Sequence, residues 1–67
     1  MSVARITEIS STSKQSFDDA VKQGIDRAIK TLRGVEGAWV KEQKVTVEND
    51  KITSYRVNML VTFLLED

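Results

Sequence analysis

The chain has 67 residues, with no cysteine, no histidine and no proline. Without histidine or cysteine it lacks disulfides, thiolate metal sites and the usual general base, so the composition indicates that it is not an enzyme. Ten basic residues balance ten acidic ones, and a net charge of zero argues against nucleic acid binding, which usually requires a basic excess.

A chain of this length is predicted to form one domain over residues 1–67, because two domains would each be too small to sustain a core. Even one core of this size is marginal, and association is the remaining common route to stability. No apolar run approaches the ~20 residues that span a bilayer. Met1–Arg5 also lacks the apolar stretch of a signal peptide. We therefore expect a cytoplasmic homo-oligomer with no membrane partner.

Residues 3–9 are predicted to form a first strand, and residues 10–13 a polar connection that ends in a helix N-cap at Ser13. A helix over residues 14–32 has the strongest signal in the sequence, because apolar and small residues recur at spacings of three and four. The stripe consists of Phe17, Val21, Gly24, Ile25, Ala28 and Leu32. Gly34 is suited to end the helix. Such a stripe is typical of a helix that packs on a sheet.

Residues 38–47 are rich in Val and Thr and predict a second strand, and residues 48–51 (Glu-Asn-Asp-Lys) predict a hairpin turn. Residues 52–65 are the predicted last strand. Its alternating apolar face consists of Tyr55, Val57, Met59, Val61, Phe63 and Leu65. These elements predict an α+β fold in the order β-α-β-β, with a three-stranded antiparallel sheet wrapped on one helix.

The apolar phase of the second strand is mixed. Ala38 and Val40 would lie on one face. The other face would hold Trp39, Lys41, Gln43, Val45 and Val47. A β-bulge near residues 43–44 would change this phase.

One helix covers only one face of a three-stranded sheet, and the Tyr55–Leu65 face is its predicted partner. This leaves Leu60, Leu64 and Trp39 on the other face, where they would form an apolar patch of the kind that marks interfaces. Polar residues are interleaved with this patch, namely Lys41, Gln43, Arg56 and Asn58. A mixed surface of this kind suits burial by other subunits, or a site for a flat ligand.

Several local motifs, in order along nearly the whole chain, resemble the dodecin family. Ser11-Thr12-Ser13 resembles the family's Gly-Thr-Ser turn, with serine in place of the usual glycine. The other matching motifs are Asp26-Arg27-Ala28, Thr31-Leu32, Tyr55-Arg56-Val57, Val61-Thr62-Phe63 and the ending Phe63-Leu64-Leu65-Glu66-Asp67.

The resemblance implies a hollow homododecamer that binds flavin (riboflavin, flavin mononucleotide or lumichrome) for storage or sequestration. Family members stack flavin rings between tryptophans near two-fold axes, and a glutamine on the last strand hydrogen-bonds the ring edge. In this sequence the tryptophan position is Gly37, Trp39 follows two residues later on the same predicted face, and the glutamine position is Arg56. Arginine donates hydrogen bonds but does not accept them.

The candidate ligand-binding residues are Gly37, Trp39, Lys44 and Arg56. Trp39 would stack on a ligand or pack between subunits. Arg56 would stack on a flat ligand, pair with a phosphate or carboxylate, or form an inter-subunit salt bridge. Lys44 would reach a ligand phosphate.

The departures at Gly37 and Arg56 leave two alternatives to flavin open. One is a dodecin-like shell that binds metal ions, calcium included, or another small ligand, and the other is a purely structural shell. Possible calcium ligands are Glu42, Glu48, Asp50, Glu66 and Asp67. No loop has the dense oxygen spacing of a dedicated calcium site, so carboxylates from several subunits would have to converge. The sequence therefore assigns no metal-binding residues.

Overall fold

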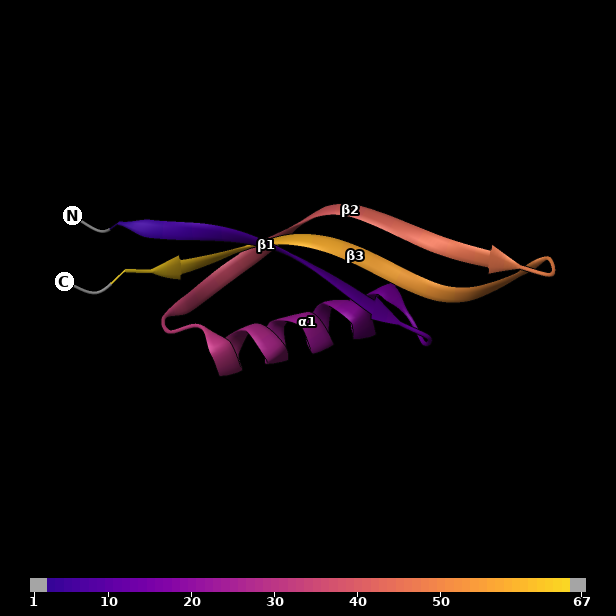
Figure 1. Cartoon of the computed structure of the whole chain (residues 1–67), viewed down its shortest axis with the longest axis horizontal. Helices are drawn as coiled ribbons and strands as arrows, with labels where there is room; N and C mark the ends of the chain where they lie inside the picture. Colours follow the sequence, from indigo (N-terminus) through magenta and orange to yellow (C-terminus); the bar gives the residue numbers. More distant parts are fainter. Residues whose placement is uncertain (1–2, 66–67) are drawn as a thin grey trace.

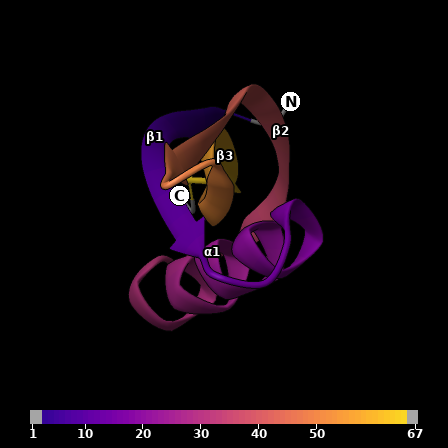
Figure 2. The same ribbon diagram turned by 90° about the vertical axis from the view of Figure 1, so that its right-hand side faces the viewer.

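The computed structural model describes residues 3–65. The elements in chain order are β1 (Ala4–Ser13), α1 (Phe17–Thr31), β2 (Val35–Glu48) and β3 (Lys51–Leu64). Both strand pairs are antiparallel and the sheet order is β1-β3-β2. The sheet curls over α1, which lies against one of its faces (Figures 1 and 2). This confirms the predicted α+β fold and its order β-α-β-β.

The connection between β1 and α1 differs from the prediction. Residues 10–13 extend β1, because each of them pairs with β3, as far as Ser13 opposite Tyr55. The helix N-cap is Ser16 and not Ser13, since the Ser16 Oγ accepts a hydrogen bond from the backbone N–H of Asp19 at 3.0 Å. Both serines fit the sequence preference for a cap. Pairing of Ser13 with β3 leaves Ser16 to begin the helix.

Ser13 fixes the turn that follows β1. Its buried Oγ accepts from the backbone N–H of Gln15 at 2.9 Å and donates to the carboxylate of Asp19 at 2.6 Å. Ser13→Ala removes these two bonds and a longer third one, donated by the backbone N–H of Ser16 at 3.4 Å, so we expect the free energy of unfolding to fall by about 1–2 kcal/mol in denaturant titrations. Ser10→Ala, at an exposed position of the same strand, should change it by less than about 0.5 kcal/mol. Equal losses in the two variants would contradict this role of Ser13.

The core lies between α1 and the middle of β3. Val57, Met59 and Val61 are fully buried there, which confirms the predicted helix-facing side of this strand. Ala20 is the buried partner on α1, and Ile9, Phe17, Val21 and Ile25 pack around it. Gly24 lets the helix approach β1, because a Cβ at this position would lie 3.0 Å from that of Ser11.

The strand β2 is irregular. Its register on β3 shifts between Val35 and Gly37, Val40 and Glu42, and Thr46 and Val47. The predicted bulge therefore exists but falls at Lys41 instead of residues 43–44. After it, Gln43 and Val45 pair with β3 residues of the helix side. The prediction that they share a face with Trp39 is wrong, because the extra residue at Lys41 reverses the alternation earlier than expected.

The turn between β2 and β3 agrees with the prediction. Asn49 and Asp50 have φ angles of 52° and 60°, in the left-handed region that these residue types tolerate. The hairpin extends well past the end of α1, and the molecule measures 52 × 19 × 13 Å (Figure 1). No helix within residues 3–65 is long and apolar enough to cross a bilayer.

Candidate functional site

The surface of the sheet opposite α1, here called the open face, carries all four predicted ligand-binding residues. Because Val57, Met59 and Val61 point toward α1, the even-numbered residues of β3 between them and around them point away from it. Cross-strand partners share a face. The register pairs Gly37 with Thr62, Trp39 with Leu60 and Lys44 with Arg56, so the four candidates lie in three rows of this face.

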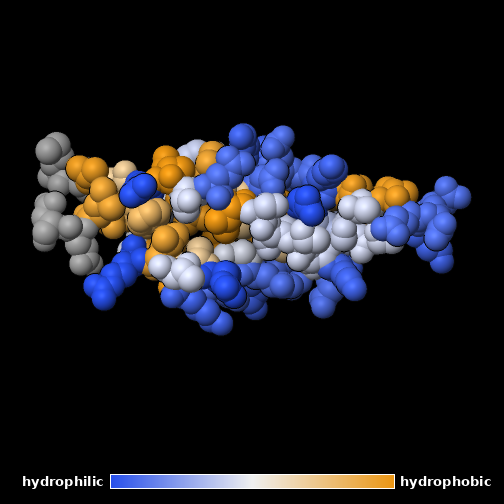
Figure 3. All heavy atoms as spheres, in the orientation of Figure 1, coloured by the Kyte–Doolittle hydropathy of each residue, from blue (hydrophilic) through white to orange (hydrophobic). Residues whose placement is uncertain are grey.

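The apolar part of the open face surrounds Trp39. Its side chain is 48% exposed beside the half-buried Leu60, and Leu64 is 37% exposed on the same face. On β1, the exposed Ile6 lies opposite Thr62. The prediction that Trp39, Leu60 and Leu64 lie on the face without a helix is confirmed. In the space-filling view, hydrophobic residues gather toward the end that holds the chain termini and again just before the hydrophilic hairpin tip (Figure 3).

Next along the sheet the open face becomes polar. The Asn58 amide nitrogen donates to Glu42 Oε1 at 3.1 Å across β2 and β3. Lys41, the residue in the bulge, lies with its Nζ 3.6 Å from Glu8 Oε1 on β1. Both side chains of this ion pair are about half exposed, so it contributes little to stability.

Two cations occupy the following row. Lys44 on β2 lies directly opposite Arg56 on β3, and Thr12 is the β1 partner of Arg56. The Arg56 Nε donates to Thr12 Oγ1 at 3.2 Å. Within residues 3–65 no carboxylate lies within ion-pair distance of either cation. Like charges directly opposite on a sheet repel each other, so this row attracts an anion.

Gly37 lies at the far end of the open face from Arg56. Its partner Thr62 is six positions from Arg56 on β3, which is about 20 Å at the usual rise of a strand. A single flavin ring is far too short to touch both positions in one chain. The family's tryptophan and glutamine, placed on this fold, would therefore meet on one ring only if two subunits contribute them.

Gly37 itself has room for a side chain. A Cβ built there has no heavy atom within 4 Å, and its φ lies outside the left-handed region, unlike that of Gly34. The exposed strand position thus does not need glycine for its backbone geometry or for its packing.

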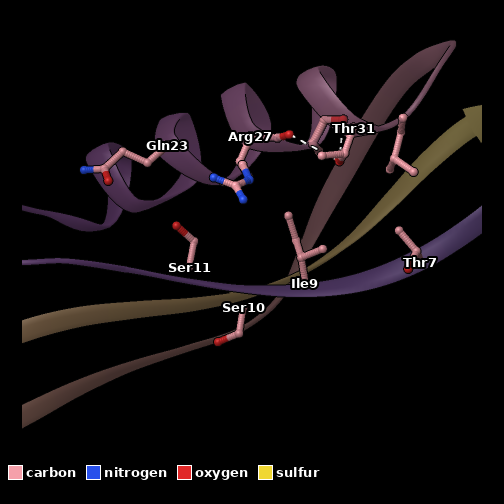
Figure 4. A pocket seen from close by; sticks show the side chains of 10 residues that line it. Thr7, Ile9, Ser10, Ser11, Gln23, Arg27 and Thr31 are labelled. Atoms are coloured by element: carbon pink, nitrogen blue, oxygen red, sulfur yellow. Dashed lines mark hydrogen bonds between the residues drawn. The ribbon is translucent and has the colours of Figure 1, made fainter.

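A groove lies between α1 and β1, away from the open face, and was not predicted from the sequence. It encloses about 480 Å³, and Gln23, Arg27 and Thr31 of α1 face Ser11, Ile9 and Thr7 of β1 across it (Figure 4). The small residues Gly24 and Ala28 in its lining are the signal that could have indicated it. Arg27 is the single charged residue of its lining, and none of the four predicted ligand-binding residues lies there.

The possible calcium ligands do not converge. Within residues 3–65 no three acidic side chains are grouped closely enough to hold a metal ion. Glu42 is hydrogen-bonded to Asn58, and Glu48 and Asp50 lie at the hairpin turn. Glu66 and Asp67 fall outside the described residues. The described part of one chain therefore does not form a calcium site by itself.

The sequence matches the family model described as Dodecin over residues 3–66. No curated protein matches it. Among solved structures, the dodecin from Streptomyces davaonensis is 32% identical, covers 98% of this chain and 97% of its own length, and has a TM-score of 0.93. Dodecin from Streptomyces coelicolor is 29% identical, with coverage of 98% and 94% and a TM-score of 0.93. The calcium-chelating antigen calcium dodecin from Mycobacterium tuberculosis is 29% identical, with coverage of 96% and 91% and a TM-score of 0.82.

Proposed function

Because the chain belongs to the dodecin family, we propose that it binds a flavin on the open face, at a boundary between subunits of a hollow homododecamer. Riboflavin, flavin mononucleotide and lumichrome are the candidate ligands. The observation that carries the proposal is the exposed Trp39 beside Leu60, on a sheet face that no helix within residues 3–65 covers. A flat aromatic ligand binds by stacking on an aromatic side chain that lies in an apolar surface.

In this proposal each predicted site residue has a specific role. Trp39 stacks on the flavin ring, and Gly37 leaves open space beside it. Arg56 donates hydrogen bonds to a ring carbonyl or a phosphate but cannot accept from a ring N–H. Lys44, opposite Arg56, contributes a second positive charge to the same row.

The proposed role is storage or sequestration in place of catalysis. The sequence has no histidine or cysteine, and the open face offers no side chain suited to act as an activated nucleophile. Assembly would supply the neighbouring subunit that closes the site over the open face. The cytoplasmic location remains a prediction from the sequence.

The direct test is a flavin titration of the purified protein. Trp39 is the single tryptophan, so riboflavin stacked on it should quench the protein fluorescence. The flavin's own fluorescence provides a second readout for Trp39→Ala, which should bind about tenfold more weakly, because a stacked aromatic pair contributes about 0.5–1.5 kcal/mol beyond its buried area. Val47→Ala, at an exposed position nearer the hairpin tip, is the control. If Trp39→Ala leaves riboflavin affinity unchanged, Trp39 packs between subunits and does not stack on the ligand.

Calcium binding is the alternative, supported by the similarity to the calcium dodecin of Mycobacterium tuberculosis. Carboxylates of several subunits would have to form the site, since residues 3–65 of one chain provide no such group. A protein that binds no flavin but melts at a higher temperature with calcium than with magnesium would favour this function. A protein that responds to neither would favour a structural shell.

A further inference from the structure

The groove between α1 and β1 has a polar end and an apolar end. At the polar end, Gln23 of α1 lies over Ser11 of β1 (Figure 4). Toward the other end the lining consists of Ile9, Ala28 and Leu32, together with Thr7 and Thr31. The Thr31 hydroxyl is already directed to the carbonyl oxygens of Arg27 and Ala28, at 3.4 Å from each. A hollow with one polar end and an aliphatic remainder suits a small amphipathic molecule.

Arg27 stands between these two ends and carries the charge of the groove. Figure 4 shows its guanidinium reaching from α1 across the groove toward β1. The lining residues one helical turn away on either side, Gln23 and Thr31, are uncharged. Within residues 3–65 no carboxylate lies within ion-pair distance of Arg27. Asp19, the acidic residue bonded to Gln23, also accepts from Ser13 and does not line the groove.

The charge and the shape of the groove together select the kind of ligand. A guanidinium binds a carboxylate through two parallel N–H···O bonds, and the half-buried Ser11 hydroxyl offers a further donor at the same end. A phosphate dianion is matched by more than one cation, whereas Arg27 is the single charged residue of the lining. From Arg27 to Leu32 is five helix positions, or about 8 Å of apolar groove, which is room for a short aliphatic chain.

We infer that the groove between α1 and β1 binds a small aliphatic monocarboxylate. Its carboxylate pairs with the Arg27 guanidinium and accepts from the Ser11 hydroxyl, and its chain lies over Ile9 toward Leu32. This site lies on the helix side of the sheet, so it is separate from the open face and does not depend on the proposed flavin function.

The test compares hexanoate with hexanamide, a neutral molecule of the same length, by saturation-transfer NMR on the assembled protein. At low salt hexanoate should bind about tenfold more tightly, and the advantage should shrink as salt screens the exposed Arg27. Arg27→Gln should reduce this ratio to about twofold or less and change the affinity for hexanamide by less than about twofold. Lys30→Gln removes an equal charge from the same helix outside the groove lining, so it should leave the ratio unaltered.

Acetate tests the apolar end of the groove, because it has the same charge as hexanoate but no chain. Hexanoate should bind at least about tenfold more tightly than acetate, since its additional methylene groups leave water for Ile9 and Leu32. Equal affinities would show that the ligand's chain stays in solvent, and the inferred aliphatic ligand would be wrong.

Three further results would overturn the inference. Equal binding of hexanoate and hexanamide, or an Arg27→Gln protein that keeps their ratio, would show that Arg27 does not hold the carboxylate. If Arg27 pairs instead with a carboxylate of a neighbouring subunit, hexanoate should receive no saturation transfer and Arg27→Gln should scatter light as a smaller oligomer. Displacement of hexanoate by riboflavin would place both ligands on the open face, whereas independent binding of the two is the expected result.

Discussion

A Leu60→Asp variant is expected to lose its assembly and its thermal stability together. Leu60 lies on the open face next to Trp39, where the proposed neighbouring subunits bury it. An unpaired carboxylate buried at such a boundary costs about 3–5 kcal/mol per subunit. The buried apolar core of one chain consists of Ala20, Ala28, Val57, Met59 and Val61. A core of this size is marginal alone, so the released subunit should unfold.

Light scattering and thermal denaturation measure the two losses in one sample series. The unmodified protein should scatter as a dodecamer at micromolar concentration, and its melting temperature should rise with protein concentration because folding and association are linked. Ile29→Asp, an exposed position on α1, is the matched control. A Leu60→Asp protein that remains a folded monomer with unchanged melting would show that the open face is not needed for stability.

The second large effect is expected from restoring the family's flavin residues. Gly37→Trp combined with Arg56→Gln should bind riboflavin at least about tenfold more tightly, because an added stacking ring contributes about 0.5–1.5 kcal/mol beyond its area and glutamine also accepts from a ring N–H. The structure favours the substitution at Gly37, where the backbone is unstrained and the space for a Cβ is empty. Isothermal titration with riboflavin measures the gain.

The same double variant separates two contributions of Arg56. Because the substitution removes the positive charge opposite Lys44, any preference for flavin mononucleotide over riboflavin should fall even as the affinity for riboflavin rises. Gly37→Trp alone is the control, since it leaves Lys44 and Arg56 intact. If the double variant binds no better than the unmodified protein, the open face accommodates another ligand, and calcium or phosphate compounds should be tested next.

The sequence predicted the order of elements because its local signals are strong. The helix stripe has a clear period, the Asn49-Asp50 turn has residues suited to positive φ angles, and β3 alternates regularly from Tyr55 to Phe63. The exposure of Trp39 was predicted because one helix covers only one face of the sheet and Trp39 was assigned to the other face. These features depend on near neighbours in the chain and can be read from composition and spacing.

Features that depend on distant pairing were predicted less well. Residues 10–13 are four hydroxyl residues in a row, and only their pairing with β3 makes them part of a strand. The bulge at Lys41 is set by how β2 fits β3, so the faces of Gln43 and Val45 were assigned wrongly. The opposition of Lys44 and Arg56 depends on the same register, which no local pattern encodes.

The position of β3 has a consequence for biosynthesis. It is the middle strand of the sheet but the last to be made, and β1 has no other neighbour among the described strands. Ala4 must pair with Leu64, so the first strand leaves the ribosome long before its partner exists. The sheet therefore closes only after translation has passed β3, and such long-range pairing slows folding. During that interval the apolar stripe of α1 has no sheet to cover it, which exposes the nascent chain to aggregation.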